Sequence, residues 1–402
     1  MISVDEAEKL VLDQAKSFGS EKISLSESLG RVLAEDIFAD RPYPPFNRAT
    51  MDGIAVKFED YEGGILDFEI ISIVAAGQKP SELKNKNECV QIMTGAAIPA
   101  TCDTVIPIED VLKKGKTAKV LSKTVRKGQF IHVLGSDKKS GDRVLKNGII
   151  INPTVIPVLA SVGKAKVSVS KLPKVAIITT GDELVEIDKK PNPYQIRRSN
   201  GYAIESLLSE LKISVDKYHM KDDLVLIKKE LQKYLLKYDI LILSGGVSKG
   251  EFDYVDKVLE KLEVRKIFHG IAQKPGKPMW FGKSKKGRLV FALPGNPVSS
   301  FAATLRYVIP EIEKSLGIKK GSQITSAVLG KDNFSIPDLT LFTQAILSVE
   351  ENGKLVATPL THNGSGDFIS VVGADCFIEF PPQKGPYKRG NSYRIWPIKS
   401  LK

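Results

Sequence analysis

Residues 239–253 read DILILSGGVSKGEFD, an apolar run that ends in two glycines, a serine and two acids. A run without alternating polar residues is typical of a strand buried on both faces of a parallel sheet. Segments of the same form occur at 175–183 (VAIITTGDE) and 289–300 (LVFALPGNPVSS). A helical pattern follows each of them, the first one capped by Asn200. This alternation predicts a doubly wound α/β domain over residues 173–318, with a parallel sheet covered by helices on both faces.

The N-terminal segment has the marks of helix followed by linker. Ser3 and Glu6 form a capping box that predicts a helix over residues 3–17, and a second short helix is expected at 26–33. The sequence RPYPP that follows cannot lie inside a helix and predicts an extended linker.

The sequence pattern predicts β-structure in two stretches, residues 48–132 and the segment from residue 319 onward. Short apolar runs broken by glycine and proline predict a β-domain at 48–132, inserted after the linker. Residues 149–163 end in glycine and are expected to form a strand and then a helix that returns to the N-terminal region. From residue 319 onward short strands return, which favours a small β-barrel.

The bulk composition excludes several classes of protein. The net charge of +12 comes from 59 Lys+Arg against 47 Asp+Glu. The basic segments of the chain carry no interleaved aromatic residues. We therefore expect them to lie on the solvated surface and not to bind nucleic acid. No run of 18 apolar residues and no secretion signal are visible, which predicts a cytoplasmic protein without membrane contact. Three distant cysteines and four histidines without a metal-binding spacing argue against a disulfide framework or a zinc site.

The residues after the three buried strands are the first candidates for a site, because ligands of such sheets bind beyond the carboxyl ends of the strands. Gly245 and Gly246 let the backbone approach a ligand and point N–H groups at an anion, and Ser248 adds a hydroxyl donor. Asp253 either holds a divalent metal or only complements a helix N-terminus. The segment matches neither a P-loop nor a dinucleotide fingerprint.

Two further segments can carry charge. Lys274-Pro275-Gly276-Lys277-Pro278 places two cations on a rigid turn, where they either meet an oxyanion or are merely solvated. Thr50-Met51-Asp52-Gly53 by itself predicts no more than a turn with an acid.

Seven segments, taken in order, resemble the motifs of one known family: SLGRVLAEDI (28–37), ATMDGIAV (49–56), IMTGAAIP (92–99), TTGDEL (179–184), SGGVSKGEFDY (244–254), KPGKP (274–278) and LPGNPVSS (293–300). The family is that of the molybdopterin molybdenumtransferases, or MoeA proteins, which includes the E domain of gephyrin. The resemblance implies an enzyme that inserts molybdate into adenylylated molybdopterin and releases AMP, with Mg²⁺ as the ion.

The resemblance also implies an assembly, a homodimer of four-domain subunits, with the molybdopterin adenylyltransferase as a conceivable partner. The fold class is then α/β plus β multidomain. The expected domains are a discontinuous helical domain (1–47 and 133–172), an inserted β-domain (48–132), the α/β domain (173–318) and a C-terminal β-barrel (319–402).

Site residues carry over where this chain matches the motifs. The resemblance implies catalytic roles for Asp52, Thr94, Asp137, Glu183 and Asp253. It implies substrate or anion binding by Gly245, Gly246, Ser248, Lys274, Lys277, Pro278, Pro294, Gly295, Pro297, Ser299 and Ser365. It implies metal binding by Glu183, Asp222 and Asp253, where the choice between Asp222 and Asp223 stays open.

Two positions depart from the family pattern. Gln344 stands where the family usually has an arginine, so a neutral amide replaces a strong partner for molybdate. Arg198 stands where the family has an acid, and we hypothesise that this extra cation compensates for Gln344.

Other functions stay open at this point. The α/β domain alone resembles the molybdopterin adenylyltransferase, although the match to ATMDGIAV and the additional β-domains argue against that activity. A scaffold protein, or a diverged relative that binds pterin and inserts metal poorly, is a further alternative. The sequence does not distinguish molybdenum from tungsten.

Overall fold

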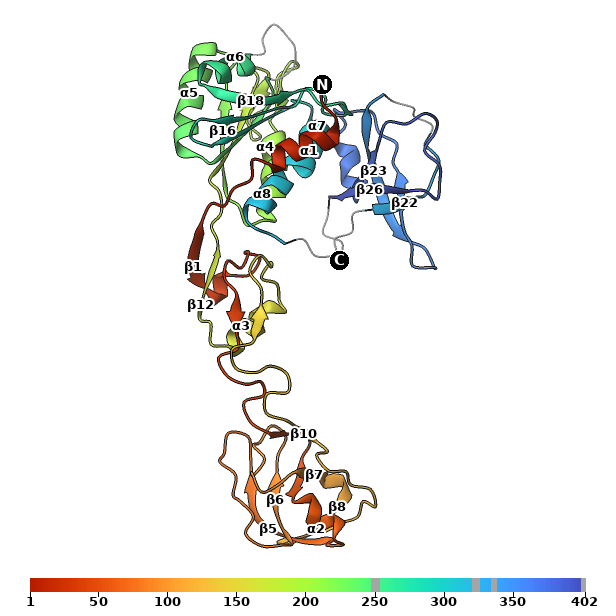
Figure 1. Ribbon diagram of the computed structural model, residues 1–402. Coiled ribbons are helices and arrows are strands. Elements are labelled where there is room, and N and C mark those ends of the chain that lie inside the picture. The colour runs from red at the N-terminus through yellow and green to blue at the C-terminus, as the bar shows by residue number, and fades with distance from the viewer. Residues whose placement is uncertain (247–253, 320–325, 334–337, 399–402) are drawn as a thin grey trace. The chain divides into compact units, whose positions relative to one another are not determined.

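The computed structural model describes residues 1–246, 254–319, 326–333 and 338–398 (Figure 1). The chain forms two compact units. The first unit comprises residues 1–34, 148–152 and 166–402, and the second comprises 35–147 and 153–165. Within the described ranges, no helix has the length and apolar character needed to cross a bilayer.

The first unit is built on a six-stranded sheet with the strand order β16-β13-β17-β21-β20-β18. Its strands are β13 (Val175–Thr180), β16 (Val215–Met220), β17 (Ile240–Ser244), β18 (Val264–His269), β20 (Trp280–Ser284) and β21 (Leu289–Leu293). The first four strands in the sheet order are parallel, as expected. Strand β20 runs antiparallel to both of its neighbours, β21 and β18, because the tight turn over 284–288 reverses the chain between β20 and β21.

Helices cover both faces of this sheet, which is the doubly wound arrangement predicted from the sequence. One face packs against α1 (Val4–Leu12), α4 (Asn200–Ser209), α7 (Pro297–Ala303), a π-helical turn (Thr304–Val308) and α8 (Ile309–Ser315). The other face packs against α5 (Leu224–Lys237) and α6 (Tyr254–Lys261), which lie together in Figure 1. Neighbouring strand residues such as Ile177 and Ile178 belong to opposite cores, as the two-residue period of a strand requires.

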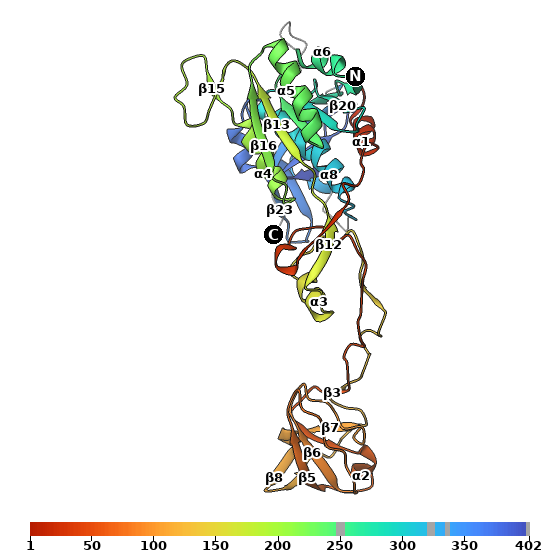
Figure 2. The same cartoon turned by 90° about the vertical axis from the view of Figure 1, so that its left-hand side faces the viewer.

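Smaller elements complete the α/β part of the first unit. Strand β1 (Ser20–Ser24) pairs with β12 (Lys166–Ser170), and a 3-10 turn lies at Leu25–Glu27. Strands β14 (Leu184–Val185) and β15 (Ile196–Arg197) pair with each other at the base of a loop that extends from the sheet (Figure 2).

The C-terminal part of the first unit is a closed barrel. Its five strands are β22 (Ser326–Leu329), β23 (Thr340–Val349), β24 (Leu355–Pro359), β25 (Cys376–Phe380) and β26 (Ser392–Pro397). The barrel closes because the long strand β23 pairs with both β24 and β25. Strand β19 (Gln273–Lys274) adds to β23, so the KPGKP turn begins on the barrel, and a 3-10 turn (Ile369–Gly373) precedes β25.

The second unit is a β-domain with a six-stranded sheet in the order β7-β4-β6-β5-β9-β8. These strands are β4 (Gly53–Val56), β5 (Asp67–Val74), β6 (Glu88–Ile92), β7 (Thr104–Pro107), β8 (Val111–Lys114) and β9 (Thr117–Val120). Two short ladders join β2 (Ile37–Phe38) to β11 (Arg143–Leu145) and β3 (Arg48–Ala49) to β10 (Ile131–His132). The remaining helices are α2 (Phe58–Glu62), α3 (Val155–Ser161) and a 3-10 turn (Ile108–Asp110).

This architecture confirms the fold class expected from the sequence, including the doubly wound domain and the C-terminal barrel. The sequence analysis divided the chain into four domains, whereas the structure separates it into two compact units. The limits of the four domains therefore stay a prediction. Helix α1 packs in the same core as the strands of the α/β sheet.

Three local predictions were wrong. The first helix begins after Ser3, whose hydroxyl accepts from the Glu6 N–H at 3.1 Å, but it ends at Leu12. No α-helix forms at 26–33, because Gly30 takes a positive φ of 84° and Leu33 instead bonds to the backbone of Ile149. Ile150 makes only an isolated bridge where a strand was expected, so the segment 149–163 contributes mainly α3.

The barrel is tied to the α/β part by the buried guanidinium of Arg306. Its side chain is 1% exposed, and its Nε and Nη2 donate to Glu379 at 3.0 Å and to Glu8 at 2.9 Å. Trp396 donates to the same Glu379 oxygen, and its ring lies against the guanidinium. These four side chains come from the π-helical turn, α1, β25 and β26, so a single cation joins elements from both parts.

We predict that Arg306→Met lowers the free energy of unfolding by about 3–5 kcal/mol, because it leaves Glu379 buried without its charge partner. Denaturant unfolding measures the effect. Lys285→Met is the matched control, since that lysine belongs to an exposed pair with Glu263 and should change stability by less than about 0.5 kcal/mol. The double variant Arg306→Met/Glu379→Met should lose less free energy of unfolding than the two single variants lose together. Losses that add up strictly would contradict this account.

A buried ionisable side chain lies in α8. The Glu311 side chain is fully buried and accepts the Ser315 hydroxyl at 2.7 Å through one carboxylate oxygen. Its other oxygen has no partner among the described residues. Burial raises the pKa of Glu311 to about 7.

The raised pKa predicts a pH-dependent stability. Between pH 4.5, near the pKa of Glu311 in the unfolded chain, and about pH 7, the folded protein keeps the Glu311 proton and the unfolded chain loses it. The stabilisation that this proton provides is therefore complete below pH 4.5 and is lost as the pH rises to about 7. Glu311→Gln keeps the acceptor for Ser315 and cannot ionise. Between pH 5 and pH 8, the free energy of unfolding of the variant should rise relative to that of the parent protein by up to about 3 kcal/mol. The exposed control Glu351→Gln should show no such gain, and parallel curves for Glu311→Gln would refute the assignment.

Candidate functional site

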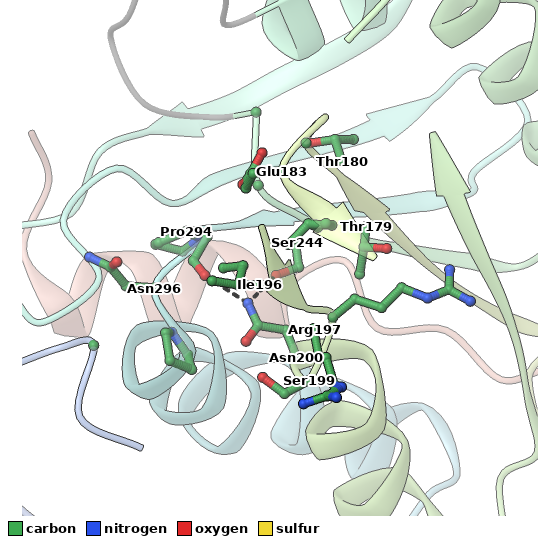
Figure 3. A pocket seen from close by; sticks show the side chains of 18 of the residues that line it. Thr179, Thr180, Glu183, Ile196, Arg197, Ser199, Asn200, Ser244, Pro294 and Asn296 are labelled. Carbon is green, nitrogen blue, oxygen red and sulfur yellow. Dashed lines mark hydrogen bonds between the residues drawn. The ribbon is translucent and has the colours of Figure 1, made fainter. Parts of the chain in front are cut away.

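A pocket of about 780 Å³ lies at the carboxyl edge of the parallel strands (Figure 3). The register places Thr179, Ser244 and Leu293 side by side on β13, β17 and β21, so the three following loops start at the same level. The pocket is lined by Thr179, Thr180, Gly181, Glu183, Leu184, Ile196, Arg197, Arg198, Ser199, Asn200, Asp222, Ser244, Gly245, Gly246, Pro278, Pro294, Gly295, Asn296, Pro297 and Gly366. We refer to it as the first pocket.

Two glycines give this pocket its backbone wall. Gly245 and Gly246 have positive φ angles of 101° and 69°. A Cβ on Gly245 would lie 2.8 Å from the Thr180 carbonyl oxygen, and one on Gly246 would lie 2.8 Å from a Val255 methyl carbon. No other residue type fits here without displacing β13 or α6, so the close approach of the backbone to the pocket requires glycine.

Asn200 connects two of the loops. Its side-chain amide donates to Ser244 Oγ at 2.8 Å and to the Gly295 carbonyl at 2.7 Å (Figure 3). The sequence predicted Asn200 as a helix cap, which was wrong, because Ser199 occupies the cap position and Asn200 is the first residue of α4. The amide therefore serves to hold the ends of β17 and β21 in place.

The charges around the first pocket are of both signs. Glu183 and Asp222 supply carboxylates, and Arg197 and Arg198 supply guanidinium groups. Arg198 is paired with Glu186. The neighbouring Asp223 does not line the pocket, since its carboxylate accepts from the N–H groups of residues 225 and 226 and caps α5. Of these two acids, Asp222 lines the first pocket and Asp223 caps α5.

A second pocket of about 1120 Å³ shares Pro278, Pro294 and Asn296 with the first. Its lining includes Lys274, Lys277, Ser299, Ser365 and residues of the barrel. Asn296 donates to Ser365 Oγ at 3.0 Å, which joins the loop after β21 to the barrel segment that closes the pocket. Two lysines and two hydroxyls make this pocket suited to an oxyanion.

Gln344 of β23 also lines the second pocket. Its side chain is 1% exposed, and neither its amide nitrogen nor its amide oxygen has a partner among the described residues. Arg198 lines the first pocket and not the second, so the structure does not support the expectation that it compensates for Gln344.

The second unit carries a polar site of its own. Asp52 Oδ1 accepts both the backbone N–H of Thr94 at 2.7 Å and its hydroxyl at 2.6 Å, and these bonds lower the pKa of Asp52. Asp137 Oδ1 pairs with His132 Nε2 at 2.8 Å, which lowers the pKa of Asp137. The segments that carry these residues are adjacent, because β3 pairs with β10 and residue 49 bonds to residues 95 and 96.

The predicted residues therefore divide among three places. The first pocket brings together Glu183, Asp222, Gly245, Gly246, Pro278, Pro294, Gly295 and Pro297. The second collects Lys274, Lys277, Pro278, Pro294, Ser299 and Ser365. Asp52, Thr94 and Asp137 lie in the second unit. Ser248 and Asp253 lie outside the described residues. Among the described residues no three His, Cys, Asp or Glu side chains cluster around a common metal position.

Several lining residues were not predicted. Thr179 and Ser199 carry hydroxyls beside the first pocket, and Lys331 and His362 line the second. Thr179 lies at the carboxyl end of the buried strand β13, and that position is a signal that sequence reasoning can use. The barrel residues gave no such signal, because their approach to the KPGKP turn depends on the pairing of β19 with β23.

Comparison with known proteins covers nearly the whole chain. Three family models match: "MoeA N-terminal region (domain I and II)" over residues 2–163, "Probable molybdopterin binding domain" over 176–314 and "MoeA C-terminal region (domain IV)" over 326–398. Together these matches run through both compact units.

Similar curated and solved proteins carry related names. A molybdopterin molybdenumtransferase of Synechocystis sp. is 39% identical over 98% of this chain and 100% of its own length. One from Staphylococcus epidermidis is 34% identical over 97% of this chain and 94% of its own. The crystal structure of a molybdopterin biosynthesis MoeA protein from Pyrococcus horikoshii is 31% identical, covers 100% of both chains and has a TM-score of 0.83. The chain therefore belongs to the MoeA family of molybdenum cofactor biosynthesis proteins.

Proposed function

We propose that this protein inserts molybdate into adenylylated molybdopterin and releases AMP. The observation that carries the proposal is the pair of adjoining pockets, which share Pro278, Pro294 and Asn296. The first pocket offers glycine backbone, carboxylates and the two guanidinium groups of Arg197 and Arg198. The second offers lysines and hydroxyls, with Asp332 as its carboxylate. A large pyrophosphate-linked pterin and a small oxyanion would have to meet at such a junction.

The first pocket is the proposed position of the adenylylated pterin. The glycine wall at Gly245 and Gly246 gives phosphate oxygens close access to backbone N–H groups. Asn200 keeps the Ser244 and Gly295 loops at a fixed spacing. A bound substrate that is held in a fixed orientation reacts over a lower activation barrier, because less entropy is lost in reaching the transition state.

The second pocket is the proposed position of molybdate. Lys274 and Lys277 would neutralise its charge, and Ser299 and Ser365 would donate to its oxygens. Gln344 would add a neutral amide to this wall. The molybdenum would then be transferred to the two dithiolene sulfurs of the pterin.

A divalent ion is part of the proposal. Glu183 and Asp222 both line the first pocket and have the carboxylate oxygens that Mg²⁺ takes as ligands. We propose that they hold Mg²⁺ together with Asp253. When bound, the ion supplies positive charge that lets an anionic substrate approach these acids.

Asp52, Thr94 and Asp137 would act from the β-domain of a partner subunit, in a homodimer whose cleft lies between subunits. A cytoplasmic location, and delivery of substrate by the molybdopterin adenylyltransferase, belong to the same proposal. The alternative activity of adenylyltransferase is disfavoured, because the barrel contributes Gln344 and Ser365 to the second pocket and an α/β domain alone would lack that wall.

We expect purified protein, given adenylylated molybdopterin, Mg²⁺ and molybdate, to release AMP only when molybdate is present. Lys277→Ala should reduce the rate about tenfold at limiting molybdate, the effect of losing one charge-assisted hydrogen bond. Lys285→Ala, which removes an exposed lysine remote from both pockets, should leave the rate unchanged. ATP consumption with molybdopterin would instead indicate an adenylyltransferase, and pterin binding without AMP release would indicate a scaffold.

Mixed dimers test the shared site. Asp52→Ala and Asp222→Ala homodimers should both be inactive, whereas co-expressed subunits should recover roughly a quarter to a half of the parental activity, because one cleft in each heterodimer is intact. Activity is read as AMP release, and heterodimers isolated through two different tags, one on each subunit, should reach the upper end of this range. Inactive heterodimers would contradict the sharing of a cleft.

A further inference from the structure

A chain of hydrogen-bonded side chains runs from Arg48 through His132 to Asp137 in the β-domain. Arg48 Nη2 lies 3.2 Å from His132 Nδ1, and His132 Nε2 lies 2.8 Å from Asp137 Oδ1. Arg48 and His132 face each other directly in the β3–β10 ladder, so the backbone register fixes their spacing. Asp137 is held beside them because its backbone N–H donates to Tyr43 at 2.9 Å.

This chain is chemically consistent with only one form of the imidazole. A guanidinium has donors and no acceptor, so Nδ1 must accept from Arg48 and carry no proton. A carboxylate only accepts, so Nε2 must carry the proton and donate it to Asp137. Arg48 therefore selects the neutral Nε2–H tautomer, and that tautomer in turn fixes the carboxylate of Asp137.

Stability does not account for this arrangement. The His132 and Asp137 side chains are 28% and 56% exposed, and exposed pairs of this kind contribute at most about 1 kcal/mol. Asp137 uses only Oδ1, which also receives the Ser136 hydroxyl at 3.4 Å. Within the described residues Oδ2 accepts no hydrogen bond. Asp52 shows the same pattern, since Thr94 binds its Oδ1 twice.

We propose that His132 is a positioning residue for Asp137, locked by Arg48 in the Nε2–H tautomer so that the free oxygen of Asp137 is presented to the substrate. This inference rests on the proposed function, because the role of Asp137 in AMP release belongs to that proposal. His132 and Arg48 touch no reacting atom in this account and act only through the carboxylate.

Substitution of His132 tests the inference in the purified protein. His132→Ala should lower kcat/KM for AMP release about tenfold, as expected when a reacting group loses its orientation. His132→Gln should recover at least half of the parental value, because the glutamine amide nitrogen can replace the Nε2–H donor. Lys57→Ala, which breaks an exposed pair with Glu59 in the same unit, is the matched control and should change nothing. Equal loss in the Ala and Gln variants, or no loss in His132→Ala, would overturn the proposal.

A spectroscopic measurement makes the test independent of activity. Nitrogen-15 NMR of labelled histidine should show His132 with Nε2 protonated and Nδ1 unprotonated, and Arg48→Met should shift it to a mixture of tautomers. The opposite tautomer in the parent protein would overturn the inference and leave the proposed function intact. Parental activity in Asp137→Asn would also overturn it, whereas absence of AMP release from the parent protein would refute the proposed function itself.

Discussion

The site depends on one geometric constraint, the common level at which the parallel strands β13, β17 and β21 end. Parallel strands bring their following loops to one edge, so residues more than a hundred positions apart in sequence come to line one pocket. The constraint is strengthened by Asn200, whose amide donates to Ser244, the last residue of β17, and to Gly295, in the loop after β21. Gly245 and Gly246 can take positive φ angles because they lack a Cβ, and Thr180 of β13 and Val255 of α6 lie too close to admit one.

The barrel gives the sheet edge a second wall. Strand β19 leaves the α/β part and adds to β23, which brings Gln344 opposite the lysines of the KPGKP turn. The buried charge of Arg306 and the contact of Phe301 with Phe377 hold the barrel in that place. An α/β fold with one ligand pocket thereby becomes a fold with two adjoining ones. The proposed chemistry needs this addition, because a pterin and an oxyanion have to be held at the same time.

Sequence patterns predicted the elements whose local residue pattern matches their surroundings in the folded protein. The three buried strands were predicted from unbroken apolar runs, and the loops that follow them supplied most of the first pocket. Residues whose role depends on tertiary contacts were missed or misassigned. Asn200 looked like a cap because its preference for that position is local, whereas its bonds to Ser244 and Gly295 are not. That Asp222 lines the first pocket while Asp223 caps α5 emerged only from the structure, and no sequence pattern could show that the Gln344 amide is buried.

The most direct test of the two-pocket account is the location of molybdenum in a crystal of the protein soaked with molybdate and AMP. Anomalous scattering at the molybdenum edge identifies the metal without reference to any assumed pose. The account predicts a single strong peak beside Lys277 and Ser299, with the nucleotide in the separate pocket at Gly245. Molybdenum among Glu183, Asp222 and Asn200, or nucleotide between the lysines and the barrel, would contradict it.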